Sequence, residues 1–205
     1  MARLMAWGGM AFVVLVVGGA FLFTQIRQPA DRLAECLAGS VAGGDIGGPF
    51  TLVDETGRTV TDQDVINGPT LVYFGFTFCP DVCPLDNERN AIAMDILDEQ
   101  GAPVDALFIS IDPERDTPEL LAEFTDVFHE RMVGLTGTQE QVDEAIQAYR
   151  VYARKVEGDD PDYYLMDHST FTYLVTPEEG FVTFFRRDLS PDQMAEQVAC
   201  VAESV

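Results

Sequence analysis

An α/β sandwich with a mixed central sheet is the fold that this sequence predicts. Runs of β-branched and aromatic residues at 70–76 and 104–111 are typical of strands buried on both faces of a sheet. A stretch with helical signals follows each run, and a hairpin is expected near each end of the folded region. Strands that alternate with helices and close with a hairpin and a helix indicate parallel and antiparallel pairing in one sheet.

The individual elements follow from local signals. Residues 51–60 are expected to form a hairpin with a turn at Gly57. Thr117 is a good helix cap and Pro118 a good first helical residue, so a helix is expected from there to about His129. The other expected elements are helices at about 85–100 and 138–149, a short strand at 132–135, a hairpin at 171–176 and 181–185, and a terminal helix from about 190.

Residues 1–26 are expected to be an uncleaved membrane anchor. No charged residue occurs between Leu4 and Phe23, and at ~1.5 Å per residue such a helix spans a hydrocarbon core of ~30 Å. No small-x-small cleavage site follows this run, which disfavours a signal peptide. Because the short N-terminus leads straight into the anchor, the rest of the chain is expected outside. Residues 27–45 are expected to be a linker and residues 46–205 the folded domain.

The charge of the chain excludes one class of ligand. The formal net charge is −23, and the segment before residue 45 has three arginines against two acids, so the remainder of the chain carries about −24. Nucleic acid is therefore not expected as a partner, since binding to phosphates needs a basic patch. An acidic surface favours basic proteins and cations, although simple solvation of the surface explains the same charge.

Two cysteines form the most informative motif. Cys79 and Cys83 follow the strand at 70–76, and in a helix starting after Cys79 they would share one face, a turn apart. This position, past a central strand and at a helix start, is the layout of thioredoxin. Thiols at a helix N-terminus have a lowered pKa and serve metal binding or disulfide exchange. The flanking prolines, Pro80 and Pro84, indicate a functional loop more than two inert buried cysteines.

A distant histidine completes the candidate site. His168 precedes the strand at 171–176, and the predicted fold brings the start of that strand near the cysteine loop. Two thiolates and an imidazole suit Cu(I) and, less uniquely, Zn(II). A hydrogen-bonded core histidine is the alternative for His168. His129 is expected on the polar side of a helix, at the surface.

Several residues near the candidate site, and the two remaining cysteines, each have two possible roles. Asp112 and Asp116 follow the adjacent strand, where they either serve a turn and a helix cap or offer a carboxylate that orients His168 or supports the site from behind the ligands. Met166 is expected to pack, with a thioether role in copper transfer as the alternative. Cys36 and Cys200 lie outside the motif and either form a disulfide between the linker and the last helix or remain separate buried thiols.

Three blocks together resemble one known family. GFTFCPDVCP at 75–84, SIDPERDTP at 110–118 and DHS at 167–169, in this order and spacing, are similar to the Sco/SenC proteins. The likeness extends from about Gly47 to the C-terminus. It implies a thioredoxin-like fold on a single-pass inner-membrane anchor, with the domain facing the periplasm, or the intermembrane space in a mitochondrion.

The resemblance also implies a ligand and partners. One copper ion, Cu(I) or Cu(II), would be held by Cys79, Cys83 and His168. It would be delivered to the binuclear copper A site of cytochrome c oxidase subunit II, or to another copper-receiving protein. Loading would involve a thiol reductant or a copper donor protein. The stretch 85–87, Leu-Asp-Asn, departs from the family's more usual Thr-Glu and concerns the partner more than the metal.

Other functions are weighed against a copper metallochaperone. A thiol–disulfide oxidoreductase would use Cys79 and Cys83 as its redox-active pair to reduce the cysteines of the copper A site, with little need for His168. A peroxidase of the peroxiredoxin kind is disfavoured, because the Pro-x-x-x-Thr-x-x-Cys spacing before the reactive cysteine is missing. A zinc site made by the three ligands and water is chemically allowed but disfavoured, because copper outcompetes zinc at such ligands.

Overall fold

A mixed β-sheet forms the centre of the molecule in a computed structural model, which describes residues 18, 33, 35–36, 46–156 and 164–204. Its strands are β1 (Thr51–Asp54), β2 (Thr59–Thr61), β3 (Thr70–Gly75), β4 (Asp105–Ser110), β5 (Met132–Thr136), β8 (Thr172–Thr176) and β9 (Gly180–Phe185). The order across the seven-stranded sheet is β2-β1-β5-β4-β3-β8-β9. The predicted mixed sheet is therefore confirmed.

Parallel and antiparallel pairs meet at the central strand β3. One edge of β3 pairs with β4 in parallel, and β4 continues to β5 in the same direction. The other edge of β3 pairs antiparallel with β8, so that Thr70 lies opposite Val175 and Tyr73 opposite Thr172. As a result, the start of β8 lies beside the carboxyl end of β3. This register brings the segment just before β8 to the loop that follows β3.

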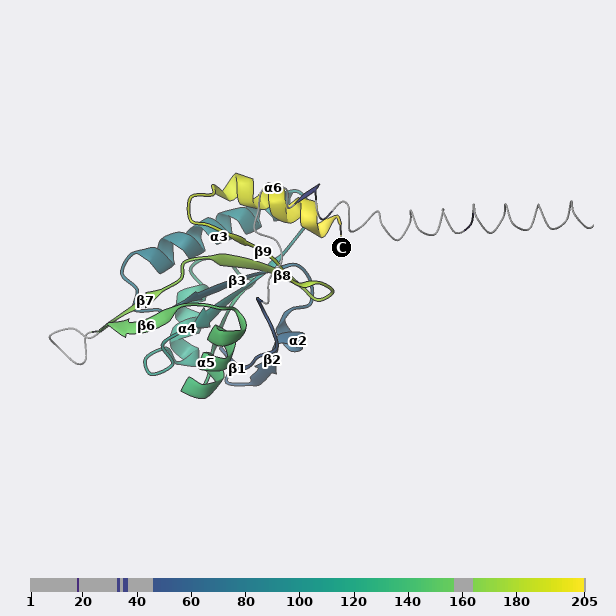
Figure 1. The fold of residues 1–205 in the computed structure, drawn as a ribbon. Coiled ribbons are helices and arrows are strands. Elements are labelled where there is room, and N and C mark those ends of the chain that lie inside the picture. The colour runs from purple at the N-terminus through teal and green to yellow at the C-terminus, as the bar shows by residue number, and fades with distance from the viewer. Residues whose placement is uncertain (1–17, 19–32, 34, 37–45, 157–163, 205) are drawn as a thin grey trace, which may run out of the picture.

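Helices cover both faces of the sheet. The longer helices are α3 (Val82–Glu99), α4 (Pro118–Thr125), α5 (Gln139–Ala148) and α6 (Pro191–Ala202). Figure 1 shows α3 and α6 together on one side of the sheet and α4 and α5 on the other. Thr117 caps α4 by accepting a hydrogen bond from the backbone N–H of Leu120, with Pro118 at the first helical position as predicted. The helix ends at Thr125, one turn earlier than expected.

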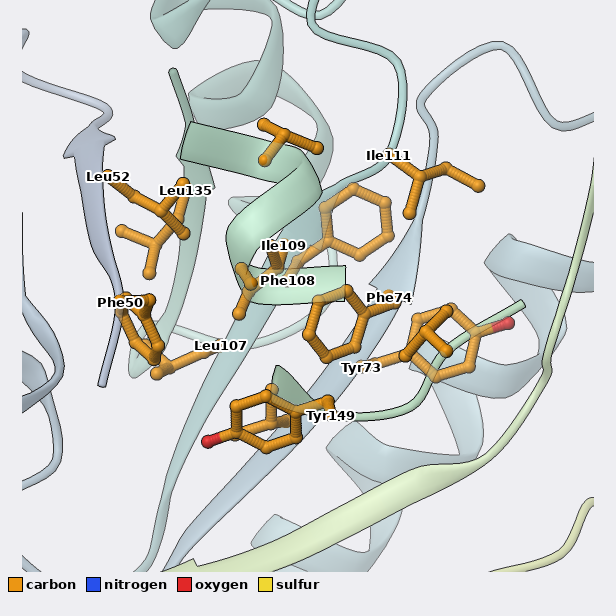
Figure 2. Packing of buried hydrophobic residues seen from close by; sticks show 14 of the residues in the cluster. Phe50, Leu52, Tyr73, Phe74, Leu107, Phe108, Ile109, Ile111, Leu135 and Tyr149 are labelled. Carbon is orange, nitrogen blue, oxygen red and sulfur yellow. The ribbon is translucent and has the colours of Figure 1, made fainter. Parts of the chain in front are cut away.

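Two apolar clusters fill the two sides of the sandwich. Leu71 and Val72 of β3 belong to different clusters, because successive side chains of a strand point to opposite faces: Leu71 packs with α3 and α6, and Val72 packs on the side of α4 and α5. Figure 2 shows the second of these clusters, in which the rings of Phe74 and Phe108 lie at the centre. The runs predicted to be buried on both faces are buried on both faces.

Three short elements were not predicted. The first is the helix α2 (Asp62–Val65), and the others are the strands β6 (Ala153–Val156) and β7 (Leu165–His168), which pair antiparallel as a separate two-stranded sheet. Residues along β6 and β7 are exposed or half-buried. Charged residues such as Arg154 and Lys155 therefore interrupt the apolar pattern by which a strand is recognised.

The expected anchor at 1–26 and linker at 27–45 lie almost entirely outside the described residues. Among the residues that the structure does describe, none belongs to a helix with the length and apolar character needed to cross a bilayer.

A disulfide links the segment before the sheet to the C-terminal helix α6. Cys36 and Cys200 are bonded, with their Cα atoms 5.7 Å apart. Leu33 and Cys36 pack against the cluster formed by α3 and α6, so this part of the chain lies against the last helix. Of the two alternatives that the sequence left open, the structure has the disulfide.

This crosslink predicts a redox-dependent stability. Replacing both cysteines, as in Cys36→Ser with Cys200→Ser, is expected to lower the free energy of unfolding by about 2–5 kcal/mol, because the crosslink closes a very long loop in the unfolded chain. Urea denaturation with and without reductant measures it. The reductant should destabilise the wild-type protein and leave the double variant unchanged; equal responses would contradict the prediction.

Candidate metal centre

The loop after β3 begins with a close approach between the backbone and a sulfur atom. At Gly75, a Cβ atom would lie 3.0 Å from Sγ of Cys83, 2.9 Å from the ring of Phe108 and 3.0 Å from the ring of Tyr73. All three neighbours are fully buried or nearly so and have no room to retreat. Glycine, which has no Cβ atom, therefore allows the end of β3 to lie in close contact with the sulfur of Cys83.

The two cysteines come together in a way that differs from the prediction. Helix α3 begins at Val82, so Cys79 precedes the helix and does not share a helical face with Cys83. The two are joined by a hydrogen bond instead, in which the backbone N–H of Cys83 donates to Sγ of Cys79 at 3.4 Å. Asp81, at the cap position, makes no side-chain capping bond, so the sulfur takes that place at the helix N-terminus.

His168 lies at the same point. It is the last residue of β7, and its Nε2 is 3.5 Å from Sγ of Cys83. Its Nδ1 lies 2.8 Å from the carbonyl oxygen of Ser169, and because a carbonyl only accepts, Nδ1 carries the proton. In the neutral ring, Nε2 is then unprotonated and directs its lone pair towards the sulfur, which is the tautomer that a metal ligand needs. The rings of Tyr73 and Phe76 flank the imidazole edge-on.

These three side chains form a compact ligand group. Within the described part of the chain, Cys79, Cys83 and His168 each offer one ligand atom, and all three atoms lie within 4.8 Å of one another. Cys83 is 0% exposed and Cys79 9% exposed, while His168 is half-buried. Two sulfurs and one imidazole nitrogen are a donor set for a soft metal ion.

The two thiols have opposite pKa shifts. A hydrogen bond from the Cys83 thiol holds the pKa of Cys79 well below its usual value, and the backbone N–H of Cys83 adds to this effect against the opposing effect of burial. The same bond and its own burial raise the pKa of Cys83. The pair therefore holds one proton at neutral pH, and a metal ion that bound both sulfurs would displace it.

Polar side chains beside the cysteines form a hydrogen-bonded network around the buried carboxylate of Asp86. The hydroxyl of Tyr73 donates to Oδ2 of Asp86 at 2.9 Å, and Nε of Arg187 donates to Oδ1 of the same carboxylate at 2.9 Å. The amide of Asn87 donates to the carbonyl of Cys83 at 2.8 Å and so braces the first turn of α3. The stretch 85–87, which departs from the family pattern, therefore contains two residues that hold the site and one, Leu85, that is 52% exposed beside it.

Neither Asp112 nor Asp116 orients His168, whose Nδ1 lies at the carbonyl oxygen of Ser169 instead, so that alternative is not the one the structure has. Asp116 accepts hydrogen bonds from the backbone and hydroxyl of Thr77 and from the hydroxyl of Ser110. It therefore fixes the start of the cysteine loop. Asp112 pairs with Arg115.

The predictions for two other residues have different outcomes. His129 was expected at the surface, but its side chain is only 7% exposed and lies 3.5 Å from Asp98 and 3.7 Å from Asp95. It falls after the end of α4, in a turn that folds back on α3, so a helical pattern could not place it. Met166 packs against the core, as expected.

Fold and site together define a class. A mixed sheet with helices on both faces, and a cysteine pair at the carboxyl end of a central strand, is a thioredoxin-like fold, here equipped with a two-cysteine, one-histidine soft-metal group. The family model described as SCO1/SenC matches residues 39–203. The chain therefore belongs to the SCO1/SenC family, which confirms the resemblance seen in the sequence.

Individual relatives agree with this assignment. Protein SenC of Rhodobacter capsulatus is 50% identical over 196 residues, which cover 95% of this chain and 88% of that protein. The crystal structure of Arabidopsis thaliana ScoI with copper bound is 41% identical, with a TM-score of 0.72, and covers 77% of this chain and 99% of that one. Bradyrhizobium japonicum ScoI with copper bound is 38% identical, with a TM-score of 0.69, over 78% and 99%.

The proton shared by the sulfurs predicts an unusual titration. An ordinary thiol, with a pKa of about 8.5, is almost fully protonated at about pH 6. In the reduced protein, because the pKa of Cys79 is lowered, one thiolate should persist well below that pH and disappear only in stronger acid. The ultraviolet absorbance of the thiolate measures it. Cys83→Ala removes the donated hydrogen bond and should shift the transition to higher pH, whereas a transition at the ordinary thiol pKa in both proteins would contradict the prediction.

Proposed function

We propose that this chain is a copper metallochaperone that binds one copper ion, as Cu(I) or Cu(II), through Cys79, Cys83 and His168. The observation that carries the proposal is the convergence of these three ligand atoms within 4.8 Å of one another. His168 presents an unprotonated Nε2 at this point, and the lowered pKa of Cys79 favours its thiolate form.

Copper fits the ligand group better than zinc does. Structural and catalytic zinc sites are four-coordinate, with three or four protein ligands in tetrahedral geometry. The group found among the described residues supplies three ligand atoms, two of them soft sulfurs, and no neighbouring carboxylate or imidazole joins it. Thiolate ligands favour Cu(I). The copper-bound structures of the Arabidopsis and Bradyrhizobium relatives support the same choice.

The proposed setting is a bacterial inner membrane. Residues 1–26 would be the single-pass anchor, 27–45 the linker, and 46–205 the copper-binding domain on the periplasmic side, or in the intermembrane space of a mitochondrion. The disulfide between Cys36 and Cys200 supports an oxidising compartment, because such bonds persist there and are rare in the cytosol.

The copper would be passed to the binuclear copper A site of cytochrome c oxidase subunit II or to another copper-receiving protein. Beside the site, Phe78 is 47% exposed and Leu85 52% exposed, so apolar surface borders the metal group. A partner that covers this surface would exclude water while the ligands exchange. Loading would need a copper donor protein, or a thiol reductant when the cysteines have been oxidised.

Thiol–disulfide exchange is the second candidate, favoured by the bond from the backbone N–H of Cys83 to Sγ of Cys79. The Cys79 thiolate would attack a disulfide of the partner and form a mixed disulfide, releasing one partner thiolate. Cys83, after losing its proton, would attack Cys79 and release the second partner thiolate. The partner would gain two electrons, and the Cys79–Cys83 disulfide would then be reduced by an external thiol.

Replacing His168 separates the two functions. His168→Ala is expected to lower Cu(II) affinity by at least about 100-fold and to abolish oxidase assembly, because the nitrogen ligand is lost. Thiol–disulfide exchange should stay largely intact, since it needs only the two sulfurs. Equilibrium dialysis, electron paramagnetic resonance and an insulin reduction assay measure these effects. His129→Ala is the control, because His129 is the other histidine of the chain and its ring lies beside Asp95, Asp98 and the backbone of Arg131 instead of the cysteines.

A His168→Ala variant that still bound copper with the wild-type spectrum would overturn the ligand assignment. A variant that lost reductase activity along with copper would favour one shared mechanism.

Metal loading and oxidation should exclude each other. Once Cys79 and Cys83 form a disulfide, no thiolate is left to bind, so the oxidised protein should take up no copper until a reductant is added. Copper-to-protein ratios before and after reduction test this. The Cys36→Ser, Cys200→Ser variant isolates the motif pair, because its second disulfide is missing. Tight loading of the fully oxidised variant would refute the role of the sulfurs.

A further inference from the structure

The loop between β4 and α4 touches both segments that carry the ligands. Asp116 holds Thr77, two residues before Cys79. Arg115, the residue before it, reaches in the other direction to Tyr164, which immediately precedes β7 and its terminal His168. The two ligand-bearing segments are thus joined through one short loop, apart from the direct contact between their ligands.

The guanidinium group of Arg115 lies among three aromatic rings. Its Cζ atom is 3.6 Å from the ring centre of Tyr164, 4.9 Å from that of Phe78 and 5.8 Å from that of Phe76. Within about 6 Å, a guanidinium is attracted to the face of such a ring. Among the described residues, its buried Nη2 finds no hydrogen-bond acceptor, so the aromatic rings take a large part in stabilising this charge.

Each of these rings is next to a ligand. Phe78 is the residue before Cys79. Phe76 makes an edge-on contact with the imidazole of His168, with ring centres 5.9 Å apart. Tyr164 immediately precedes β7, the strand that ends at His168. A single cation therefore packs against the neighbours of two of the three ligands.

Hydrogen bonds fix the direction of this cation. Nε of Arg115 donates to Oδ2 of Asp112 at 2.5 Å, and Nη1 donates to the carbonyl of Tyr164 at 3.0 Å. The hydroxyl of Tyr164 donates to Oδ1 of Asp112 at 2.7 Å and closes the ring of contacts. Lys155 of β6 lies 3.7 Å from the ring centre of Tyr164 and pairs with Glu114 at 3.0 Å. Both strands of the hairpin are thus tied to residues 112–115.

The hairpin depends on such ties. Strands β6 and β7 pair only with each other and form no ladder with the seven-stranded sheet. A two-stranded hairpin is marginally stable on its own in water. Its base is joined to β8 through residues 169–171, and its far end is held by Arg115 and Lys155. Figure 1 shows β6 and β7 lying together at one end of the molecule.

We infer that Arg115 is a positioning residue that holds the β6–β7 hairpin against the cysteine loop and thereby keeps His168 at the sulfurs. The inference deepens the proposed function and rests on it, because the geometry that Arg115 maintains is that of the copper ligands. Lysine cannot replace it fully, since an ammonium group lacks the planar fork that stacks on Tyr164 while it donates to Asp112 and the backbone.

The test compares Arg115→Leu and Arg115→Lys with the wild-type protein. Arg58→Leu is the matched control, because Arg58 also pairs with a buried aspartate, Asp54, in the hairpin of β1 and β2. Hydrogen exchange of the backbone amides at 165–168 is measured in the metal-free protein. Copper affinity is measured by competition with a chelator, and the nitrogen signal of the imidazole by electron paramagnetic resonance of the Cu(II) form.

Arg115→Leu is expected to speed exchange across β7, to weaken copper binding by about 10-fold or more, and to reduce the imidazole signal. Arg115→Lys should lie between Arg115→Leu and the wild type, and Arg58→Leu should match the wild type in all three measurements. Wild-type exchange, affinity and imidazole signal in Arg115→Leu would overturn the inference. Failure of both Arg115 variants to fold would also overturn it, because Arg115 would then be a residue of the core.

The two proposals fail in different ways. A wild-type protein that bound no copper would refute the proposed function. Exchange in the metal-free protein would still decide whether Arg115 holds the hairpin.

Discussion

The antiparallel pairing of β8 with β3 decides where the candidate ligands meet. Nε2 of His168 and Sγ of Cys83 lie 3.5 Å apart although 85 residues separate them in the chain. Antiparallel pairing of β8 with β3 creates this contact, because it returns the chain to the carboxyl end of the strand that leads into the cysteine loop. The ligand group is thus a consequence of the order of strands in the sheet.

Around that contact, the molecule keeps its sulfurs buried but reactive. Burial alone raises the pKa of a thiol and would leave both cysteines protonated. For Cys79, the hydrogen bond donated by the Cys83 thiol and the hydrogen bonds from backbone N–H groups at the start of α3 lower the pKa and offset the effect of burial. Because Gly75 has no side chain, the backbone can lie close to the sulfur of Cys83. Asp116 fixes the start of the cysteine loop by accepting a hydrogen bond from Thr77. The site is therefore ready for an ion without exposing its sulfurs to solvent.

The ligand-bearing segments differ in how they are supported. Cys83 belongs to a long helix packed on the central sheet, and the position of its first turn is fixed by Asn87. His168 belongs to a small separate sheet that is held by side-chain contacts at its far end. Under the proposed function, the weaker support of His168 would help the site to release its ion to a partner.

The sequence by itself determined the fold class, most of the strands and helices, and the three candidate ligands, because apolar runs, proline caps and the Cys-x-x-x-Cys spacing are local signals. Tertiary structure decided the β6–β7 hairpin, the tautomer of His168, the partner of Asp116, the burial of His129 and the bond between Cys36 and Cys200. Each of these depends on residues distant in the chain that meet only after folding, and no local pattern encodes such a meeting. Periodicity in the sequence shows which face of a helix or strand is apolar. Hydrogen bonds, ring contacts and disulfides depend instead on which distant side chains the folded sheet places next to that face.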